Sequence, residues 1–209
     1  MPALHRRAAG WFLQHGEVVD AIRHTQAAGD WSAASRLLAD HSFGLTLDGQ
    51  AQTIKALLRA FPPGADGDSS ELAIAHATTD LAQGRLDEAA AHLAVAEART
   101  GTTPSARRRR HQVAIASLKV SLARRRGSLA GVLEQAAFLT SPVTGQSDED
   151  IALDNDLRAV GLMNLGIIEA WSLGTQDAER HLLEGAALAR ENGHPYLEVA
   201  CLAQLAFAS

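Results

Sequence analysis

The stretch Gly16-Glu17-Val18-Val19-Asp20-Ala21 decides the fold of this 209-residue chain. It contains a glycine, an apolar residue two places later and an alanine five places later. Residues 29–34 and 84–89 repeat this pattern, residues 127–132 carry a looser copy, and residues 174–178 carry a copy one residue shorter. Glycine readily ends a helix in the left-handed conformation, and a small residue in the next helix lets two helices pack closely. Because each copy lies between stretches of helical periodicity, the pattern predicts stacked helical hairpins.

The composition also favours helices, because alanine and leucine dominate and aromatic residues make up only 4% of the chain. We expect helices over residues 3–15, 17–28, 31–41, 46–61, 70–83, 85–99, 104–126, 128–140, 149–173, 175–192 and 195–207. Loops are expected near residues 62–70, which begin with two prolines, and near residues 141–147. Asp30 and Thr103 are expected to cap the helices that follow them.

The copies of the glycine pattern are irregularly spaced, so a strict repeat is excluded. The fold class we predict is all-α, a superhelical array of antiparallel helix hairpins that forms a degenerate tetratricopeptide-like α-solenoid. Residues 1–209 are expected to make one such helical repeat domain, as a piece of a larger protein.

The charge and cysteine content exclude several classes of protein. A net charge of −5 gives no reason to expect direct contact with nucleic acid or a membrane. No apolar run approaches the roughly 20 residues of a membrane span. The single cysteine, Cys201, excludes an internal disulfide, fits a reducing cytosol and is expected to be a small buried residue. Together these features predict a cytoplasmic protein.

No arrangement of residues predicts catalysis, a cofactor or a metal site. The nine histidines include no pair three or four positions apart, which a helical zinc site needs. The phosphate-binding sequence Gly-x-x-x-x-Gly-Lys-Ser/Thr and the nucleophile sequence Gly-x-Ser-x-Gly are both missing. Trp11, Trp31 and Trp171 could stack on a sugar ring, but their helical positions favour the core. We therefore expect a protein that is not an enzyme.

Basic residues are concentrated in one part of the chain, because nine of the nineteen Lys and Arg residues lie between Arg99 and Arg126. One interpretation is a solvated helix face, partly paired with the acidic residues of segment 148–156. The other is a surface for an anionic ligand or another domain. The residues of that surface would be Arg107, Arg108, Arg110, Arg124 and Arg125.

The helix expected over residues 157–173 is apolar on nearly all sides. Such a helix is either buried between neighbouring hairpins or lines a groove that receives a partner. A groove of this kind would be lined by Val160, Met163, Ile167 and Trp171. Gly161 and Gly166 would allow neighbouring helices to approach closely.

Residues 4–38 contain a more specific set of short sequences. They are Leu4-His-Arg-Arg-Ala-Ala-Gly-Trp11-Phe, His15-Gly16, Asp20-Ala-Ile-Arg-His24, Ala27-Ala-Gly-Asp-Trp31 and Ala34-x-x-Leu37-Leu. This block resembles the segment that follows the ATPase region in large LuxR-type transcription regulators similar to the maltose-regulon activator. Later pieces, such as residues 84–97 and 165–193, fit the same family but are common to many tetratricopeptide-like arrays.

The resemblance implies a sensor and scaffold region that lies between a nucleotide-binding module and a DNA-binding helix-turn-helix. Both of those parts are missing from the 209 residues, so neither activity is assigned to them. The implied function is binding of a small-molecule inducer or a regulatory protein, which gates activation and self-association. Other domains of the parent chain are implied partners. The alternative is a free-standing adaptor that binds a peptide or helix in its concave groove.

Overall fold

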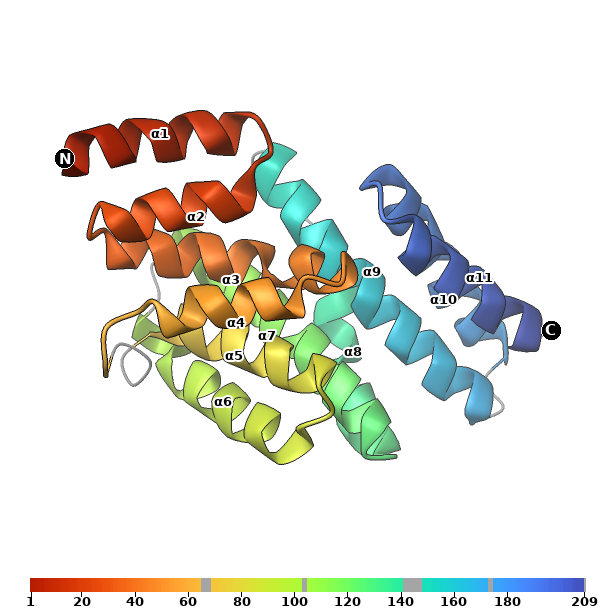
Figure 1. The fold of residues 1–209 in the computed structure, drawn as a ribbon. Coiled ribbons are helices and arrows are strands. Elements are labelled where there is room, and N and C mark those ends of the chain that lie inside the picture. The colour runs from red at the N-terminus through yellow and green to blue at the C-terminus, as the bar shows by residue number, and fades with distance from the viewer. Residues whose placement is uncertain (65–68, 103–104, 141–147, 173–174, 209) are drawn as a thin grey trace. The chain divides into compact units, whose positions relative to one another are not determined.

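The computed structural model describes residues 1–64, 69–102, 105–140, 148–172 and 175–208. Within these ranges it contains eleven α-helices, a short 3-10 helix and no strand (Figure 1). The predicted all-α class is confirmed. The chain divides into two compact units, an N-terminal unit of residues Met1–Arg99 and a C-terminal unit of residues Thr100–Ser209.

Six helices form the N-terminal unit: α1 (Pro2–Gln14), α2 (Val18–Ala27), α3 (Trp31–Leu47), α4 (Ala51–Arg59), α5 (Ser70–Ala82) and α6 (Leu86–Arg99). Helices that follow one another in sequence pack together, and α3 also packs directly against α5. The core is apolar and draws on α2, α3, α4 and α5. Its buried members are Ile22, Ala34, Leu38, Leu45, Ile54, Leu57, Leu58, Phe61, Leu72 and Ala75.

Five α-helices form the C-terminal unit after the 3-10 turn η2 (Thr100–Thr102): α7 (Ser105–Arg125), α8 (Leu129–Thr140), α9 (Asp148–Trp171), α10 (Thr175–Glu191) and α11 (Pro195–Ala208). Helix α7 packs against α8 and α9, whereas α10 packs against α9 and α11. A buried apolar cluster joins α7, α8 and α9. It consists of Ala116, Val120, Ala123, Val132, Leu139, Leu165 and Ile168.

One hydrogen-bonded turn joins the helices at several places in both units. Its glycine is left-handed, with φ between 71° and 76° at Gly16, Gly29, Gly49, Gly84, Gly127 and Gly193. The amide that follows each glycine donates to the carbonyl five residues earlier, as from Glu17 to Phe12 at 2.9 Å and from Ser128 to Ala123 at 2.8 Å. This bond satisfies a carbonyl that the end of the helix leaves without a partner. The turn confirms the predicted role of four pattern glycines, whereas Gly174 lies outside the described residues.

The residue five places after the glycine is buried in the helix that follows at five of these six turns, the exception being Glu198 after Gly193. Ala21, Ala34 and Ala89 are fully buried. The amide of each donates to the carbonyl of the residue after the glycine, at 2.9–3.0 Å, which is the first hydrogen bond of the new helix. The predicted cap at Asp30 is confirmed, because its carboxylate accepts the Ala33 amide at 3.0 Å. The predicted cap at Thr103 lies outside the described residues.

The predicted helix boundaries between residues 41 and 61 are wrong. Helix α3 continues to Leu47, and α4 begins at Ala51 and ends at Arg59. The reason is Gly49, which forms the same left-handed turn and lets the Gln50 amide donate to the Leu45 carbonyl at 2.8 Å. This copy of the pattern was missed because Ile54, not alanine, is the fully buried residue five places after the glycine.

Two glycines of α9 lie at close contacts between helices, as predicted. A Cβ atom added to Gly166 would lie 2.6 Å from Leu182 Cγ in α10, and one added to Gly161 would lie 2.7 Å from Leu139 Cδ1 in α8. Real Cβ atoms do not approach carbon this closely, so either substitution requires the neighbouring leucine to move.

We predict that Gly166→Ala destabilises the protein by about 1–3 kcal/mol, because the added methyl overfills the contact between α9 and α10. Gly10→Ala is the matched control: Gly10 lies within α1, and nothing lies within 4 Å of an added Cβ. The control is expected to be neutral or stabilising by up to about 1 kcal/mol, because alanine favours helix. Urea unfolding followed by circular dichroism measures both. Equal effects of the two changes would contradict the close contact.

Candidate functional site

A cavity of about 270 Å³ opens on the N-terminal unit beside α4 and α5. Its walls come from α4, from α5 and from the turn that precedes α6. They are formed by Lys55, Leu58, Arg59, His76, Thr79, Asp80 and Arg85. Three of these side chains are cations and one is a carboxylate, so the described part of the lining carries a net positive charge. The volume suits a small molecule rather than a peptide.

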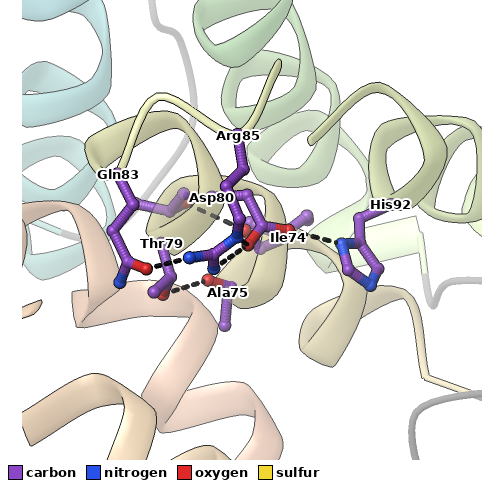
Figure 2. A network of polar contacts seen from close by, with 8 residues as sticks. Ile74, Ala75, Thr79, Asp80, Gln83, Arg85 and His92 are labelled. Atoms are coloured by element: carbon purple, nitrogen blue, oxygen red, sulfur yellow. Dashed lines mark hydrogen bonds and ion pairs between the residues drawn. The ribbon is translucent and has the colours of Figure 1, made fainter. Parts of the chain in front are cut away.

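Asp80 is buried at the end of α5 and accepts hydrogen bonds from two directions (Figure 2). Arg85 donates from Nε to Asp80 Oδ1 at 3.0 Å, and its Nη2 atom contacts the same oxygen. His92 Nδ1 lies 2.8 Å from Asp80 Oδ2. Because an ionised carboxylate can only accept, His92 Nδ1 carries the proton and donates it. Both oxygens of Asp80 are therefore occupied, and its charge is balanced by Arg85.

Further contacts hold this cluster in place. The Gln83 side-chain oxygen accepts from Arg85 Nη1, and the Thr79 hydroxyl donates to the Ala75 carbonyl at 2.9 Å (Figure 2). The rings of His76 and His92 stack, with centroids 4.8 Å apart and planes inclined by 20°. Gln83 Nε2 is buried without a hydrogen-bond partner among the described residues. These contacts hold the Asp80 and Arg85 side chains in one arrangement at the cavity wall.

Lys55 and Arg59 line the cavity from α4. They are four residues apart on α4, so they share one face of the helix. Neither makes an ion pair with any residue that the structure describes. Like charges at this spacing destabilise a helix by a few tenths of a kcal/mol, although the helix C-terminus favours a cation at Arg59.

A second cavity of about 270 Å³ lies elsewhere on the N-terminal unit, and its walls are largely uncharged. It is lined by Trp31, Ser32, Ser35, Phe61, Ser69, Glu71 and Leu72. The Trp31 indole is tilted against Phe61, with ring centroids 5.6 Å apart. The prediction that the tryptophans belong to the core is wrong, because Trp11, Trp31 and Trp171 are 53%, 37% and 63% exposed.

The five arginines predicted to form a surface for an anionic ligand or another domain are spread along α7. Arg108 and Arg125 are exposed and Arg107 is partly buried, whereas Arg110 is buried. At 1.5 Å per residue, Arg107 and Arg125 lie roughly 27 Å apart along the helix axis. The structure therefore does not bring the five side chains to one small ligand.

Arg124 is engaged in a buried polar network of the C-terminal unit. Its Nε donates to Asn164 Oδ1, and Asn164 Nδ2 donates to Ser121 Oγ at 3.0 Å and to the Val160 carbonyl at 2.8 Å. Burial, and secondly the charge of Arg125, lower the pKa of Arg124. The network links α7 to α9, which gives Arg124 a structural role.

The apolar stripe predicted to line a groove on α9 is not exposed along its length. Val160 and Ile167 are buried, Met163 is partly buried, and Trp171 alone of the four is exposed. Large exposed apolar side chains occur instead on α10 and α11. They are Leu183, Tyr196, Val199, Leu202 and Phe207. Glu198, the single charged residue of α11, pairs with Arg190 at 2.7 Å.

The part of the chain that the structure describes contains no group of three or more His, Cys, Asp or Glu side chains that could hold a metal ion. Nor does any helix in that part combine the length and apolar character needed to cross a bilayer. Cys201 is fully buried, as predicted, and burial raises the pKa of its thiol to about 11. Such a thiol is a poor nucleophile at neutral pH.

Sequence reasoning did not single out Lys55, Arg59, Asp80 or Arg85. The sequence did contain a signal for Asp80 and Arg85. These oppositely charged residues lie five positions apart on either side of Gly84, which is the spacing of the hydrogen bond that closes the turn. The spacing of Lys55 and Arg59 indicates a shared helix face. That this face borders α5 depends on tertiary packing, which the spacing does not reveal.

A scan against protein-family models, a search of curated proteins and a search of solved structures each found no match to this chain. The function of this chain is therefore inferred from its own sequence and geometry.

We predict that Asp80→Asn lowers the free energy of unfolding by about 2 kcal/mol, because it replaces charge-assisted hydrogen bonds by weaker ones at a buried site. The matched control is Asp20→Asn, which removes the exposed pair between Asp20 and Arg23 at 3.1 Å. The control is expected to cost less than about 1 kcal/mol. Both values come from urea unfolding at neutral pH. A cost at Asp80 no larger than that at Asp20 would refute the importance of the cluster.

Cys201 provides a pH-dependent prediction. The folded thiol has a pKa of about 11, against an ordinary value of 9.0, so only the unfolded state loses this proton as the pH rises between those values. The free energy of unfolding is therefore expected to fall between about pH 9 and pH 11. The part of this fall that comes from the Cys201 thiol should be missing in the variant Cys201→Ala. At pH 8, an aromatic disulfide reagent should react slowly with the thiol of the folded protein. It should react rapidly once urea has unfolded the chain. Fast reaction without urea would contradict the burial.

Proposed function

We propose that this chain is a ligand- or protein-binding sensor and scaffold region of a LuxR-type transcription regulator, working in the cytoplasm. Its architecture would be a degenerate tetratricopeptide-like array, which the recurring turn between packed helices supports. The short sequences of residues 4–38 support the family. In this proposal the region gates activation and self-association, and other domains of the parent chain bind ATP and DNA.

The observation that carries the proposal is the cavity beside α4 and α5. Its charged walls are assembled by helix packing, so a ligand meets an arrangement that already exists. Asp80 is the sole carboxylate among the described lining residues, and Arg85 and His92 occupy both of its oxygens. A carboxylate held in this way serves as a structural anchor rather than as a general base. The site is thus better suited to binding than to catalysis.

The proposed mechanism is a shift between two arrangements of the helices. A ligand shifts such an equilibrium only if it binds one arrangement more tightly than the other. The lining supports such a mechanism because Lys55 belongs to α4 and Arg85 belongs to the turn between α5 and α6. A ligand in contact with both favours arrangements that keep α4 against the α5–α6 hairpin.

The exposed apolar residues of α10 and α11 favour a second candidate function. Tyr196 and Phe207 are 85% and 80% exposed, and α11 carries little charge. Exposed apolar patches commonly bind other proteins. This observation favours a free-standing tetratricopeptide-like adaptor that binds a peptide or an amphipathic helix.

The parent reading frame tests the regulator proposal against the adaptor. We expect Gly-x-x-x-x-Gly-Lys-Ser/Thr upstream of residue 1 and a helix-turn-helix downstream of residue 209, because the resemblance places this segment between those parts. Sequencing the gene with its flanking regions provides the measurement. A natural start codon at Met1 together with a natural stop codon after Ser209 would contradict the regulator proposal and favour the adaptor.

A further inference from the structure

We propose that the cavity formed by Lys55, Leu58, Arg59, His76, Thr79, Asp80 and Arg85 binds a small molecule through an oxyanion group, either a carboxylate or a phosphate. The inference rests on the proposed sensor function and names the chemical class of its ligand.

The charge of the lining is the first argument. Asp80 is neutralised by its ion pair with Arg85, so this pair leaves no net charge. Lys55 and Arg59 then contribute two positive charges that no carboxylate of the described residues balances through an ion pair. An anion in the cavity supplies the missing negative charge and relieves the repulsion between these neighbours on α4.

The donors available in the cavity are the second argument. Arg59 offers a planar fork of N–H groups that matches the two oxygens of a carboxylate or a phosphate, and Lys55 adds a mobile ammonium group. The Asp80 oxygens and the nearby Gln83 side-chain oxygen already receive hydrogen bonds from Arg85 and His92. The charged donors Lys55 and Arg59 therefore face no unengaged carboxylate among the described lining residues, which favours an acceptor-rich ligand.

The size and the apolar part of the wall limit the rest of the ligand. A volume of about 270 Å³ holds a molecule of a few heavy atoms beyond the oxyanion group. Leu58 gives one face of the cavity an apolar surface. A short-chain carboxylic acid and a small phosphate compound share these properties.

Isothermal titration calorimetry of the full chain at low salt tests the inference, with sodium succinate and sodium orthophosphate as separate probes. We expect saturable binding of at least one probe, and the probe that binds more tightly identifies the oxyanion. The double variant Lys55→Gln/Arg59→Gln should weaken binding at least about tenfold, because it removes both charge-assisted contacts. The control Arg6→Gln/Arg7→Gln removes two exposed charges of α1 outside the cavity and should change affinity less than about twofold.

Two outcomes would overturn the inference: no saturable binding of either probe to the wild-type chain, or equal weakening by the cavity variant and by the α1 control. Circular dichroism verifies that each variant is folded. The single variants Lys55→Gln and Arg59→Gln provide the same comparison if the double variant loses helical signal. The two proposals can fail separately. If the wild-type chain binds neither probe but its gene encodes the ATP-binding and helix-turn-helix sequences, the ligand class is overturned and the regulator proposal stands.

Discussion

The hydrogen bond that closes each left-handed glycine turn is the interaction on which both units depend. At Gly16, Gly84 and Gly127 it returns the amide after the glycine to the carbonyl five residues earlier, at 2.8–2.9 Å. The bond fixes where one helix ends, and the residue after the glycine accepts the first bond of the next helix. Because the turn is only a few residues long, the second helix folds back onto the first, and the fully buried residue five places after the glycine sets how closely they pack.

The same turn positions the candidate site. At Gly84 the closing bond joins the Arg85 amide to the Asp80 carbonyl at 2.9 Å, and the Arg85 side chain donates to the Asp80 carboxylate at 3.0 Å. The equivalent pairs at other turns lack opposite charges, as with Phe12 and Glu17 or Ala123 and Ser128. The turn before α6 is thus the ordinary joint of this fold with an ion pair added. The added pair fixes the Arg85 guanidinium against α5, where it forms part of the cavity wall.

Much of the fold follows from local sequence because its determinants are local. A left-handed glycine, a cap such as Asp30 and a buried alanine five places after a glycine act within a few residues, so the helices and most of their ends were predicted. Gly49 was missed because isoleucine replaces alanine in its copy of the pattern. The tryptophans were misplaced because helical periodicity does not distinguish a covered face from an exposed one.

The candidate site could not be predicted in the same way, because it depends on contacts between distant segments. Lys55 becomes part of the candidate site only because α4 packs beside α5, which carries Asp80. No short sequence pattern predicts that these two helices are neighbours. The arginines of α7 show the converse. Their density in the sequence suggested one surface, but helix geometry distributes them over roughly 27 Å, and Arg124 is committed to Asn164. A binding site in such an array is thus specified by which helix faces meet, and charge density along the chain is a poor guide to it.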